Sequence, residues 1–382
     1  LVYLDNAATT QVPLPVLEAV RSHYLGQNAN VHRGIHTLSN ESTAKLEAAR
    51  RTAARFLGAE EDEIIFTSGT TASVNLLAQA YREILGPEDE VVVTVMEHHS
   101  NFVPWQMLCA RTGAAFRVCP LTEAGEVDLD ALAELVTDRT KVVACAQVSN
   151  VLGTVNPLAE IAEIAHAAGA VFAVDGAQGV RHGITDVHEI GCDFYSFSGH
   201  KMLAPGGTGV LYGRREQLAK LTPPFYGGGM VDKVTVQRTT FEPAPGGWEA
   251  GTPNFQGAVG LAAAMDYLDE IGRTEIAEYE NHLVTLTDEV LRDIPGVRVL
   301  GDPQERAGCV SFAAEGAHSF DVAALLDKLG FAVRSGHHCA QPLLASLGLE
   351  HCVRVSPAFY NTEGEIERFG DALRQVCGLL RG

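Results

Sequence analysis

The sequence lacks several features that define common classes of protein. No apolar run approaches the roughly 20 residues that cross a bilayer, and the opening LVYLDNAATT lacks the basic-then-apolar order of a signal peptide. Basic residues are scarce, because 28 Lys and Arg stand against 48 Asp and Glu, for a net charge of −20. Such an acidic chain is poorly suited to nucleic-acid backbones or anionic lipid surfaces. We therefore expect a cytoplasmic protein that binds neither nucleic acid nor membrane.

Missing cysteine and glycine motifs argue against several kinds of metal, cofactor and catalytic site. The 8 cysteines contain no C-x-x-C pair, so the sequence suggests neither a zinc ribbon nor a dense disulfide framework. We expect mostly reduced thiols and no metal site. Also missing are a G-x-G-x-x-G turn between a strand and a helix, a G-K dipeptide and a G-x-S-x-G elbow. Assignment as a dinucleotide enzyme, a nucleoside triphosphatase or a serine hydrolase therefore loses support.

What remains is typical of a large α/β enzyme. The 382 residues, 46% of them hydrophobic, are enough for two or three domains. Apolar, β-branched runs alternate with helical patterns as far as residue 212, which predicts βαβ units and a mostly parallel sheet. The predicted strands are 63–67, 90–94, 115–119, 141–147, 171–174, 194–198 and 209–212, and the predicted helices include 71–85, 130–136 and 158–168.

The pattern changes after residue 212. Proline and glycine clusters within 223–247 predict an irregular loop or lid. Helices are then predicted at 256–271 and 274–294, followed by strands near 297–300, 309–312 and 331–334. This mixture predicts a second, smaller α+β domain.

Polar motifs follow four of the predicted strands. They are 67–71 (TSGTT), 97–100 (EHHS), 175–178 (DGAQ) and 198–201 (SGHK). Ligands of open parallel sheets bind outside the carboxyl ends of the strands, so we expect these motifs to share one site. Each residue alone has an ordinary explanation, such as a helix cap for Thr70 or a solvated surface lysine for Lys201. Together they indicate a site for pyridoxal phosphate.

Each motif has a physical role in that chemistry. Hydroxyls and free N–H groups at 68–71 can hold a phosphate at a helix N-terminus. Lys201 follows an apolar strand and offers a partly desolvated amine for a covalent bond to the cofactor. Asp175 can pair with the protonated pyridine nitrogen, and Gln178 can reach the ring oxygen. His98 can stack on the ring and carry a proton.

Ten segments of the chain carry a resemblance to one family. They are 4–10 (LDNAATT), 28–39 (NANVHRGIHTLS), 66–71 (FTSGTT), 97–106 (EHHSNFVPWQ), 148–158 (VSNVLGTVNPL), 174–178 (VDGAQ), 193–201 (DFYSFSGHK), 249–254 (EAGTPN), 334–344 (RSGHHCAQPLL) and 354–362 (RVSPAFYNT). In this order they resemble the class V aminotransferase-like cysteine desulfurases, specifically the group II, SUF-type enzymes related to selenocysteine lyases.

The resemblance implies a fold and partners. The fold would be that of the type I pyridoxal-phosphate-dependent transferases, with a large cofactor-binding domain at 12–262. A small domain, formed by 1–11 and 263–382, would carry the catalytic cysteine loop. The family also implies a homodimer and a sulfur-acceptor protein of an iron–sulfur assembly system.

The same resemblance assigns residues. The implied cofactor-binding set is Thr70, Thr71, His98, Asp175, Gln178, Ser198, His200, Lys201 and Thr252, the last contacting the phosphate held by the opposite subunit. Asn150 and His32 match positions of the family's active site and are assigned to substrate binding.

Cys339 matches the family's sulfur acceptor. A lone cysteine is usually a small buried hydrophobe, but 336–342 (GHHCAQP) is a polar loop in which nearby imidazoles can favour the thiolate. We reject a His-His-Cys metal site, because adjacent histidines seldom converge on one ion and no fourth ligand is evident. Arg354 and Arg334 are candidates for gripping a substrate carboxylate, with structural ion pairs as the alternative.

These features predict a cysteine desulfurase that converts L-cysteine to L-alanine and leaves the sulfur on Cys339 as a persulfide. Lys201, Cys339 and His98 are its predicted catalytic residues. A lyase acting on L-selenocysteine is the main alternative. An aminotransferase, racemase or epimerase would not need a thiol at 339, and a non-catalytic assembly subunit would not need Lys201 and Asp175.

Overall fold

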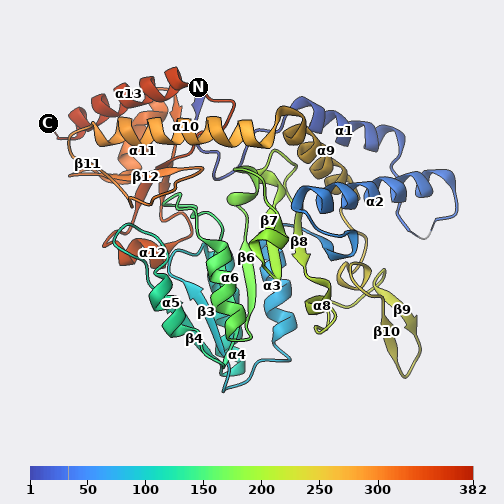
Figure 1. Ribbon diagram of the computed structural model, residues 1–382. Helices are drawn as coiled ribbons and strands as arrows, with labels where there is room; N and C mark the ends of the chain where they lie inside the picture. The colour runs from blue at the N-terminus through green and yellow to red at the C-terminus, as the bar shows by residue number, and fades with distance from the viewer. Residues whose placement is uncertain (33, 382) are drawn as a thin grey trace.

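A seven-stranded sheet forms the centre of the computed structural model, which describes residues 1–32 and 34–381 (Figure 1). The strand order is β2-β8-β7-β6-β5-β3-β4. The strands are β2 (Ile64–Thr67), β3 (Glu90–Thr94), β4 (Ala115–Cys119), β5 (Thr140–Ala146), β6 (Val171–Asp175), β7 (Phe194–Ser198) and β8 (Gly209–Gly213). β3 to β7 pair in parallel, and β8 runs antiparallel to both of its neighbours. The prediction of a mostly parallel sheet is confirmed.

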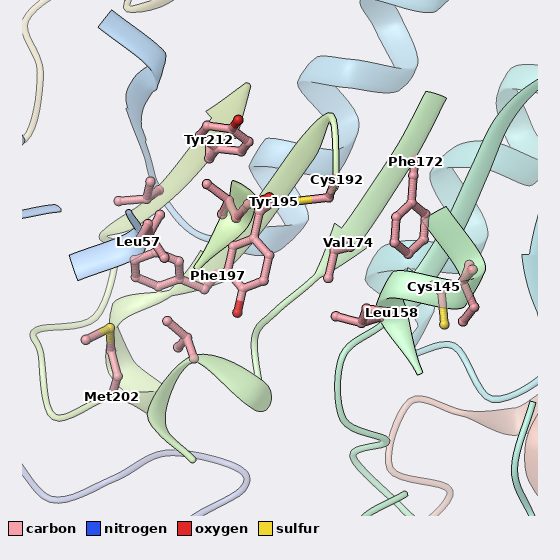
Figure 2. Packing of buried hydrophobic residues seen from close by; sticks show 14 of the residues in the cluster. Leu57, Cys145, Leu158, Phe172, Val174, Cys192, Tyr195, Phe197, Met202 and Tyr212 are labelled. Atoms are coloured by element: carbon pink, nitrogen blue, oxygen red, sulfur yellow. Dashed lines mark hydrogen bonds between the residues drawn. The ribbon is translucent and has the colours of Figure 1, made fainter. Parts of the chain in front are cut away.

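Both faces of this sheet are buried. Along β3, Val92 packs into one core while Val91 and Val93 pack into the other. The first core also contains residues of α2 (Thr37–Leu57), α6 (Leu158–Ala167) and α9 (Phe255–Ile271). Figure 2 shows a part of it, with Phe172 and Phe197 projecting from the sheet. Because strands buried on both faces are continuous apolar runs, the sequence locates them closely.

The opposite face carries two helices that matter for the site. α3 (Thr70–Tyr81) follows β2, and α4 (His99–Thr112) follows β3. Both contribute to the second core. Because each helix begins shortly after a strand ends, its N-terminus lies at the carboxyl end of that strand. The other helices before α9 are α1 (Leu14–Gly26), α5 (Leu129–Leu135), α7 (Val187–Ile190) and α8 (Arg215–Leu218).

The C-terminal elements form a second layer around a four-stranded antiparallel sheet, ordered β11-β12-β15-β14. Its strands are β11 (Val297–Val299), β12 (Val310–Ala314), β14 (Arg334–Gly336) and β15 (Cys352–Val355). The helices of this part are α10 (Arg273–Arg292), α11 (Ser319–Lys328), α12 (Gln341–Ser346) and α13 (Glu363–Arg381). The N-terminal strand β1 (Val2–Tyr3) joins this part by pairing with β13 (Phe331–Ala332). The domain boundaries near residues 12 and 262 stay a prediction.

Two expected elements differ in the structure. The stretch 223–247 contains a hairpin of β9 (Val231–Val234) and β10 (Thr239–Phe241), which projects from the body of the molecule (Figure 1). The residues of this hairpin are largely exposed, so its sequence lacks the alternation of apolar and polar residues that predicts a strand. The single strand expected at 331–334 is divided between β13 and β14, which belong to different sheets. Across the described residues, no helix has the length and apolarity needed to cross a membrane.

Candidate active site

A cavity of about 440 Å³ lies at the carboxyl ends of the central strands. All but two of the predicted site residues line it, namely Lys201, Cys339, His98, Thr70, Thr71, Asp175, Gln178, Ser198, His200, Arg354, Asn150 and Arg334. The two exceptions, His32 and Thr252, line a separate cavity of about 240 Å³. The motifs that follow separate strands thus meet at one place, as the topology requires.

One end of the large cavity is a cradle of hydroxyl groups at the start of α3. Gly69, the N-cap of this helix, has a φ of +136°, and a Cβ there would lie 3.0 Å from Ser198 Oγ. The Thr70 N–H donates to Ser198 Oγ at 2.9 Å, and Thr71 Oγ1 lies 2.7 Å from Ser100 Oγ. Hydroxyls around a helix N-terminus form a site for a phosphate group.

Asp175 ends β6 and is buried beneath the cavity. Desolvation raises the pKa of its carboxyl group, although the Ala177 N–H donates to it at 2.9 Å and Lys201 favours its charge. A buried carboxylate needs a positive partner. The protonated ring nitrogen of a pyridine fits that need. Gln178 is fixed beside it by donating from Nε2 to the Ala7 carbonyl at 2.8 Å.

Lys201 stands in the 3₁₀ turn Gly199–Lys201 directly after β7. Desolvation lowers the pKa of its amine to about 8, even though Asp175 acts in the opposite direction. An amine with a pKa of about 8 is neutral in roughly a tenth of the molecules at pH 7, far more than an ordinary lysine, and the neutral amine is the form that reacts with an aldehyde.

His98 is the N-cap of α4, and its Nδ1 accepts from the Ser100 N–H at 3.1 Å. Burial, together with the charge of Lys201, lowers its pKa to about 3. The imidazole is therefore neutral, and we place its proton on Nε2 because Nδ1 is an acceptor. The hydroxyl cradle, the buried carboxylate and the lysine amine together fit pyridoxal phosphate.

Cys339 is exposed, whereas the other seven cysteines are buried. It lies between β14 and α12, with left-handed backbone conformations at His338 (φ 51°) and Cys339 (φ 53°). The Cys339 N–H donates to His337 Nδ1 at 3.1 Å, and its carbonyl accepts from the His99 N–H at 2.7 Å. The cysteine loop is thus tied to the start of α4, next to His98.

The expectation that nearby imidazoles favour the thiolate does not hold for His338. His338 does not favour a Cys339 thiolate, because its Nε2 lies 3.2 Å from the Cys352 carbonyl. Burial, with Arg354 nearby, lowers the pKa of His338 to about 3, so the ring is uncharged. In the part of the chain that the structure describes, no group of His, Cys, Asp or Glu residues is arranged to hold a metal ion.

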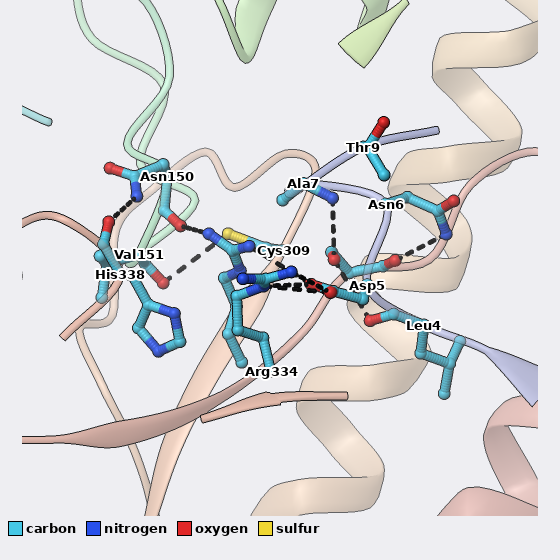
Figure 3. Close-up of polar contacts among 12 residues, drawn as sticks. Leu4, Asp5, Asn6, Ala7, Thr9, Asn150, Val151, Cys309, Arg334 and His338 are labelled. Atoms are coloured by element: carbon cyan, nitrogen blue, oxygen red, sulfur yellow. Dashed lines mark hydrogen bonds and ion pairs between the residues drawn. The ribbon is translucent and has the colours of Figure 1, made fainter. Parts of the chain in front are cut away.

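Two arginines lie at the other end of the cavity. Arg354, on β15, donates from Nη1 to the Asn150 carbonyl at 2.8 Å, while its buried Nε has no hydrogen-bond partner. Arg334 pairs with Asp5 at 2.8 Å (Figure 3). Asn150 in turn donates from Nδ2 to the His338 carbonyl at 2.8 Å. The arginine end is therefore connected to the cysteine loop.

The sequence reasoning gave no individual role to three residues at or beside this site, although all three lie in segments that it singled out. Ser100 lines the cavity and bonds to His98, which the N-cap pattern of α4 could have shown. Glu97 is fully buried and accepts from Thr94, Asn101 and the Ala146 N–H, and burial raises its pKa to about 8. Asp5 meets Arg334 across 329 residues of sequence, and no local pattern signals such a pair.

Comparison with known proteins gives consistent similarities. The family described as aminotransferase class-V matches residues 2–369. A probable cysteine desulfurase from Halalkalibacterium halodurans is 47% identical over 98% of this chain and 93% of its own. A cysteine desulfurase from Cronobacter sakazakii is 47% identical over 100% of this chain and 93% of its own.

Solved structures agree with these relatives. The apo structure of a cysteine desulfurase from Thermococcus onnurineus superposes with a TM-score of 0.95 at 40% identity, covering 99% of this chain and 94% of that one. The cysteine desulfurase CsdA from Escherichia coli has a TM-score of 0.93 at 41% identity, with the same coverage of 99% and 94%. The shared fold therefore extends over both parts of the molecule.

Proposed function

This chain belongs to the aminotransferase class-V family, and we propose that it acts as a pyridoxal-phosphate-dependent cysteine desulfurase. It converts L-cysteine to L-alanine and passes the sulfur to its own cysteine. The observation that carries this proposal is the placement of an exposed thiol, Cys339, on the same cavity as Lys201 and Asp175. The relatives named as cysteine desulfurases support the choice of cysteine over selenocysteine.

Pyridoxal phosphate is the cofactor of this family, and the cavity supplies a group for each part of it. Thr70, Thr71, Ser198 and His200 would hold the phosphate, and Lys201 would hold the aldehyde carbon. Asp175 would keep the ring nitrogen protonated, with Gln178 at the ring oxygen and His98 on the ring face. When bound, the cofactor withdraws electrons from the substrate's α-carbon and so weakens the bonds next to it.

The substrate's position follows from the arginine end of the cavity. The buried Arg354 guanidinium, with an Nε that has no partner, would bind the α-carboxylate, beside Asn150. The Lys201 amine, which its lowered pKa keeps partly neutral, would take the proton from the α-carbon. The neutral His98, whose proton is on Nε2, would donate that N–H toward the substrate sulfur.

Sulfur transfer requires the thiolate of Cys339. This thiolate attacks the substrate sulfur, so that a sulfur–sulfur bond forms while the bond from that sulfur to the β-carbon breaks. The electron pair of the broken bond goes to the β-carbon, which then takes up a proton to give alanine. A thiol of a reductant or an acceptor protein later removes the sulfur from Cys339.

Several finer assignments accompany this function. We place the enzyme in the group II, SUF-type subgroup on its 334–344 segment, with an iron–sulfur assembly protein as acceptor. A homodimer would bring Thr252 and His32 of one subunit to the cofactor of the other, since these two residues lie outside the large cavity.

A cytoplasmic location suits an exposed catalytic thiol, because that compartment keeps thiols reduced. Arg334 is a second candidate for substrate binding.

The test is alanine and sulfide release from L-cysteine by the holoenzyme, with and without a thiol reductant. The wild type is expected to be yellow and to form alanine faster with reductant. Cys339→Ala should keep its colour and lose at least about 100-fold in rate. Cys109→Ala, which removes a buried thiol from α4 outside the cavity, should retain both. Alanine formation by Cys339→Ala at the wild-type rate would overturn the proposal.

A further inference from the structure

Glu97 is a buried carboxyl group that the proposed mechanism does not use. It is 0% exposed and stands between the end of β3 and His98, the N-cap of α4. Its Oε1 accepts from Thr94 Oγ1 at 2.6 Å and from the Ala146 N–H at 3.1 Å. Its Oε2 accepts from Asn101 Nδ2 at 2.6 Å. The side chain therefore holds together the ends of β3 and β5 and the first turn of α4.

The orientation of this hydrogen-bonded group is fixed from its far side. Asn101 Oδ1 accepts from Trp105 Nε1 at 3.1 Å, so the Nδ2 group of Asn101 has to face Glu97. Asn101 and Trp105 are both buried. A buried polar group that loses its partner costs free energy, which keeps these contacts in place. Both carboxyl oxygens of Glu97 must therefore act as acceptors, one toward Asn101 and one toward the Ala146 N–H.

The segments that Glu97 holds place two groups of the large cavity. The Asn101 N–H donates to the His98 carbonyl at 2.8 Å, so Asn101 fixes the start of α4. Ala146 lines the cavity and is the register partner of Asp175 in the parallel pair of β5 and β6. His98 and Asp175 line the same cavity. A displacement of the Glu97 carboxyl group would thus move the imidazole relative to the Asp175 carboxylate.

From this geometry we infer that Glu97 is a positioning residue, which holds His98 and Asp175 where they meet the cofactor ring. It acts through Asn101 on the first and through Ala146 on the second. The inference rests on the proposed function for the roles of His98 and Asp175. A shift of about 1 Å in a catalytic group can cost about 100-fold in rate. The partners of Glu97 lie at the cofactor end of the cavity, so binding of the substrate carboxylate should depend on it little.

The test exchanges the carboxyl and amide groups of the pair Glu97 and Asn101. In Glu97→Gln one donor has to face another, because Asn101 Nδ2 and the Ala146 N–H both need an acceptor. In Asn101→Asp two carboxyl groups face each other. The double variant, Glu97→Gln with Asn101→Asp, returns a donor and an acceptor to every contact, since the new carboxylate can accept from both the new amide and Trp105.

Three quantities are measured on the holoenzymes: kcat and KM for alanine formation from L-cysteine, and the circular dichroism of the cofactor's visible band, which reports the groups around the ring. We expect Glu97→Gln to lower kcat at least about tenfold, to change KM less than about threefold and to alter the visible circular dichroism. Asn101→Asp should do the same. The double variant should have a kcat within about threefold of the wild type and the wild-type circular dichroism.

A matched control separates positioning from stability. Glu63 is 5% exposed and accepts from the N–H groups of Glu60 and Arg215 at 3.1 Å, before the start of β2 and so at the opposite end of the sheet. Glu63→Gln should lower the free energy of unfolding but keep the wild-type kcat and circular dichroism. Thr94→Val removes a single donor from Glu97 and should lower kcat at least about threefold, which tests the inference if Glu97→Gln does not fold.

The inference is overturned if Glu97→Gln, or Thr94→Val where Glu97→Gln does not fold, has the kcat and the visible circular dichroism of the wild type. It is also overturned if the double variant keeps the defects of Glu97→Gln, or if Glu63→Gln shows the same defects. A wild type that forms no alanine would contradict the proposed function, whereas the visible circular dichroism of the same proteins would still judge the role of Glu97.

Discussion

At the scale of single residues, burial prepares the Lys201 amine for its reaction. Desolvation lowers its pKa from the ordinary 10.5 to about 8, so the neutral form becomes dominant above pH 8. Because only the neutral amine attacks an aldehyde, the cofactor-free protein should take up pyridoxal phosphate faster as pH rises, levelling off above about 8. Stopped-flow absorbance measures this rate. A rate that keeps increasing tenfold per unit beyond pH 9 would show that the pKa is not lowered.

A site residue can be predicted from the sequence when its neighbours along the chain show where it lies in the fold. His98 and Lys201 stand directly after predicted strands, so sequence reasoning could place them on one cavity, where the structure also puts them. Asp5 has no such signal, because it is defined by arginines on β14 and β15 at the far end of the chain. The roles of His32 and Thr252 remain predictions, since they depend on a second subunit.

At the scale of elements, a buried ion pair holds the segment that leads to Thr252. The Glu249 carboxylate accepts from Arg50 of α2 at 2.8 Å and from the Phe66 N–H of β2 at 2.7 Å. The Arg50 and Glu249 side chains are 4% and 7% exposed. Glu249→Ala leaves the Arg50 charge buried without this partner, so the free energy of unfolding should fall by about 3–5 kcal/mol.

A matched control is available on the same helix. Arg55 of α2 pairs with Asp266 of α9 at 2.7 Å, but both side chains are 59% exposed. Asp266→Ala should cost less than about 1 kcal/mol, because water screens an exposed pair. Denaturant unfolding of both variants measures the difference. Equal losses for the two variants would refute the role of burial.

Elements differ in how far the sequence determines them. β3 and β7 have the predicted bounds, because strands buried on both faces are flanked by polar turns and stand out in the sequence. β4 also has the predicted bounds, although it is a partly exposed strand at the edge of the sheet. The hairpin β9–β10 escaped prediction, since its exposed residues carry no such pattern and lie between proline and glycine clusters. The split of 331–334 into β13 and β14 depends on pairing with β1 and β15, which are distant in sequence.

At the scale of the whole molecule, the proposed dimer makes a prediction about an exposed apolar residue. Ile35 is 100% exposed and stands three residues after His32, which shares a cavity with Thr252. Burial of this side chain against a second subunit would explain its presence. Ile35→Asp should therefore raise the dimer dissociation constant by at least about tenfold, measured by analytical ultracentrifugation.

The control for the dimer is Phe320→Asp on α11, which changes an exposed apolar residue in the C-terminal part of the molecule. It should leave the dimer intact. A wild type that sediments as a monomer, or two variants that dissociate equally, would contradict the placement of the interface.

The central claim is that sulfur leaves the substrate on Cys339. The most direct measurement is mass spectrometry of the holoenzyme after incubation with L-cysteine in the absence of a reductant, followed by digestion under non-reducing conditions. The account predicts the mass of one added sulfur atom on the peptide that contains Cys339, together with an equal amount of alanine. The added sulfur should be lost when a thiol is added. Alanine formation with no added sulfur on Cys339 would contradict it.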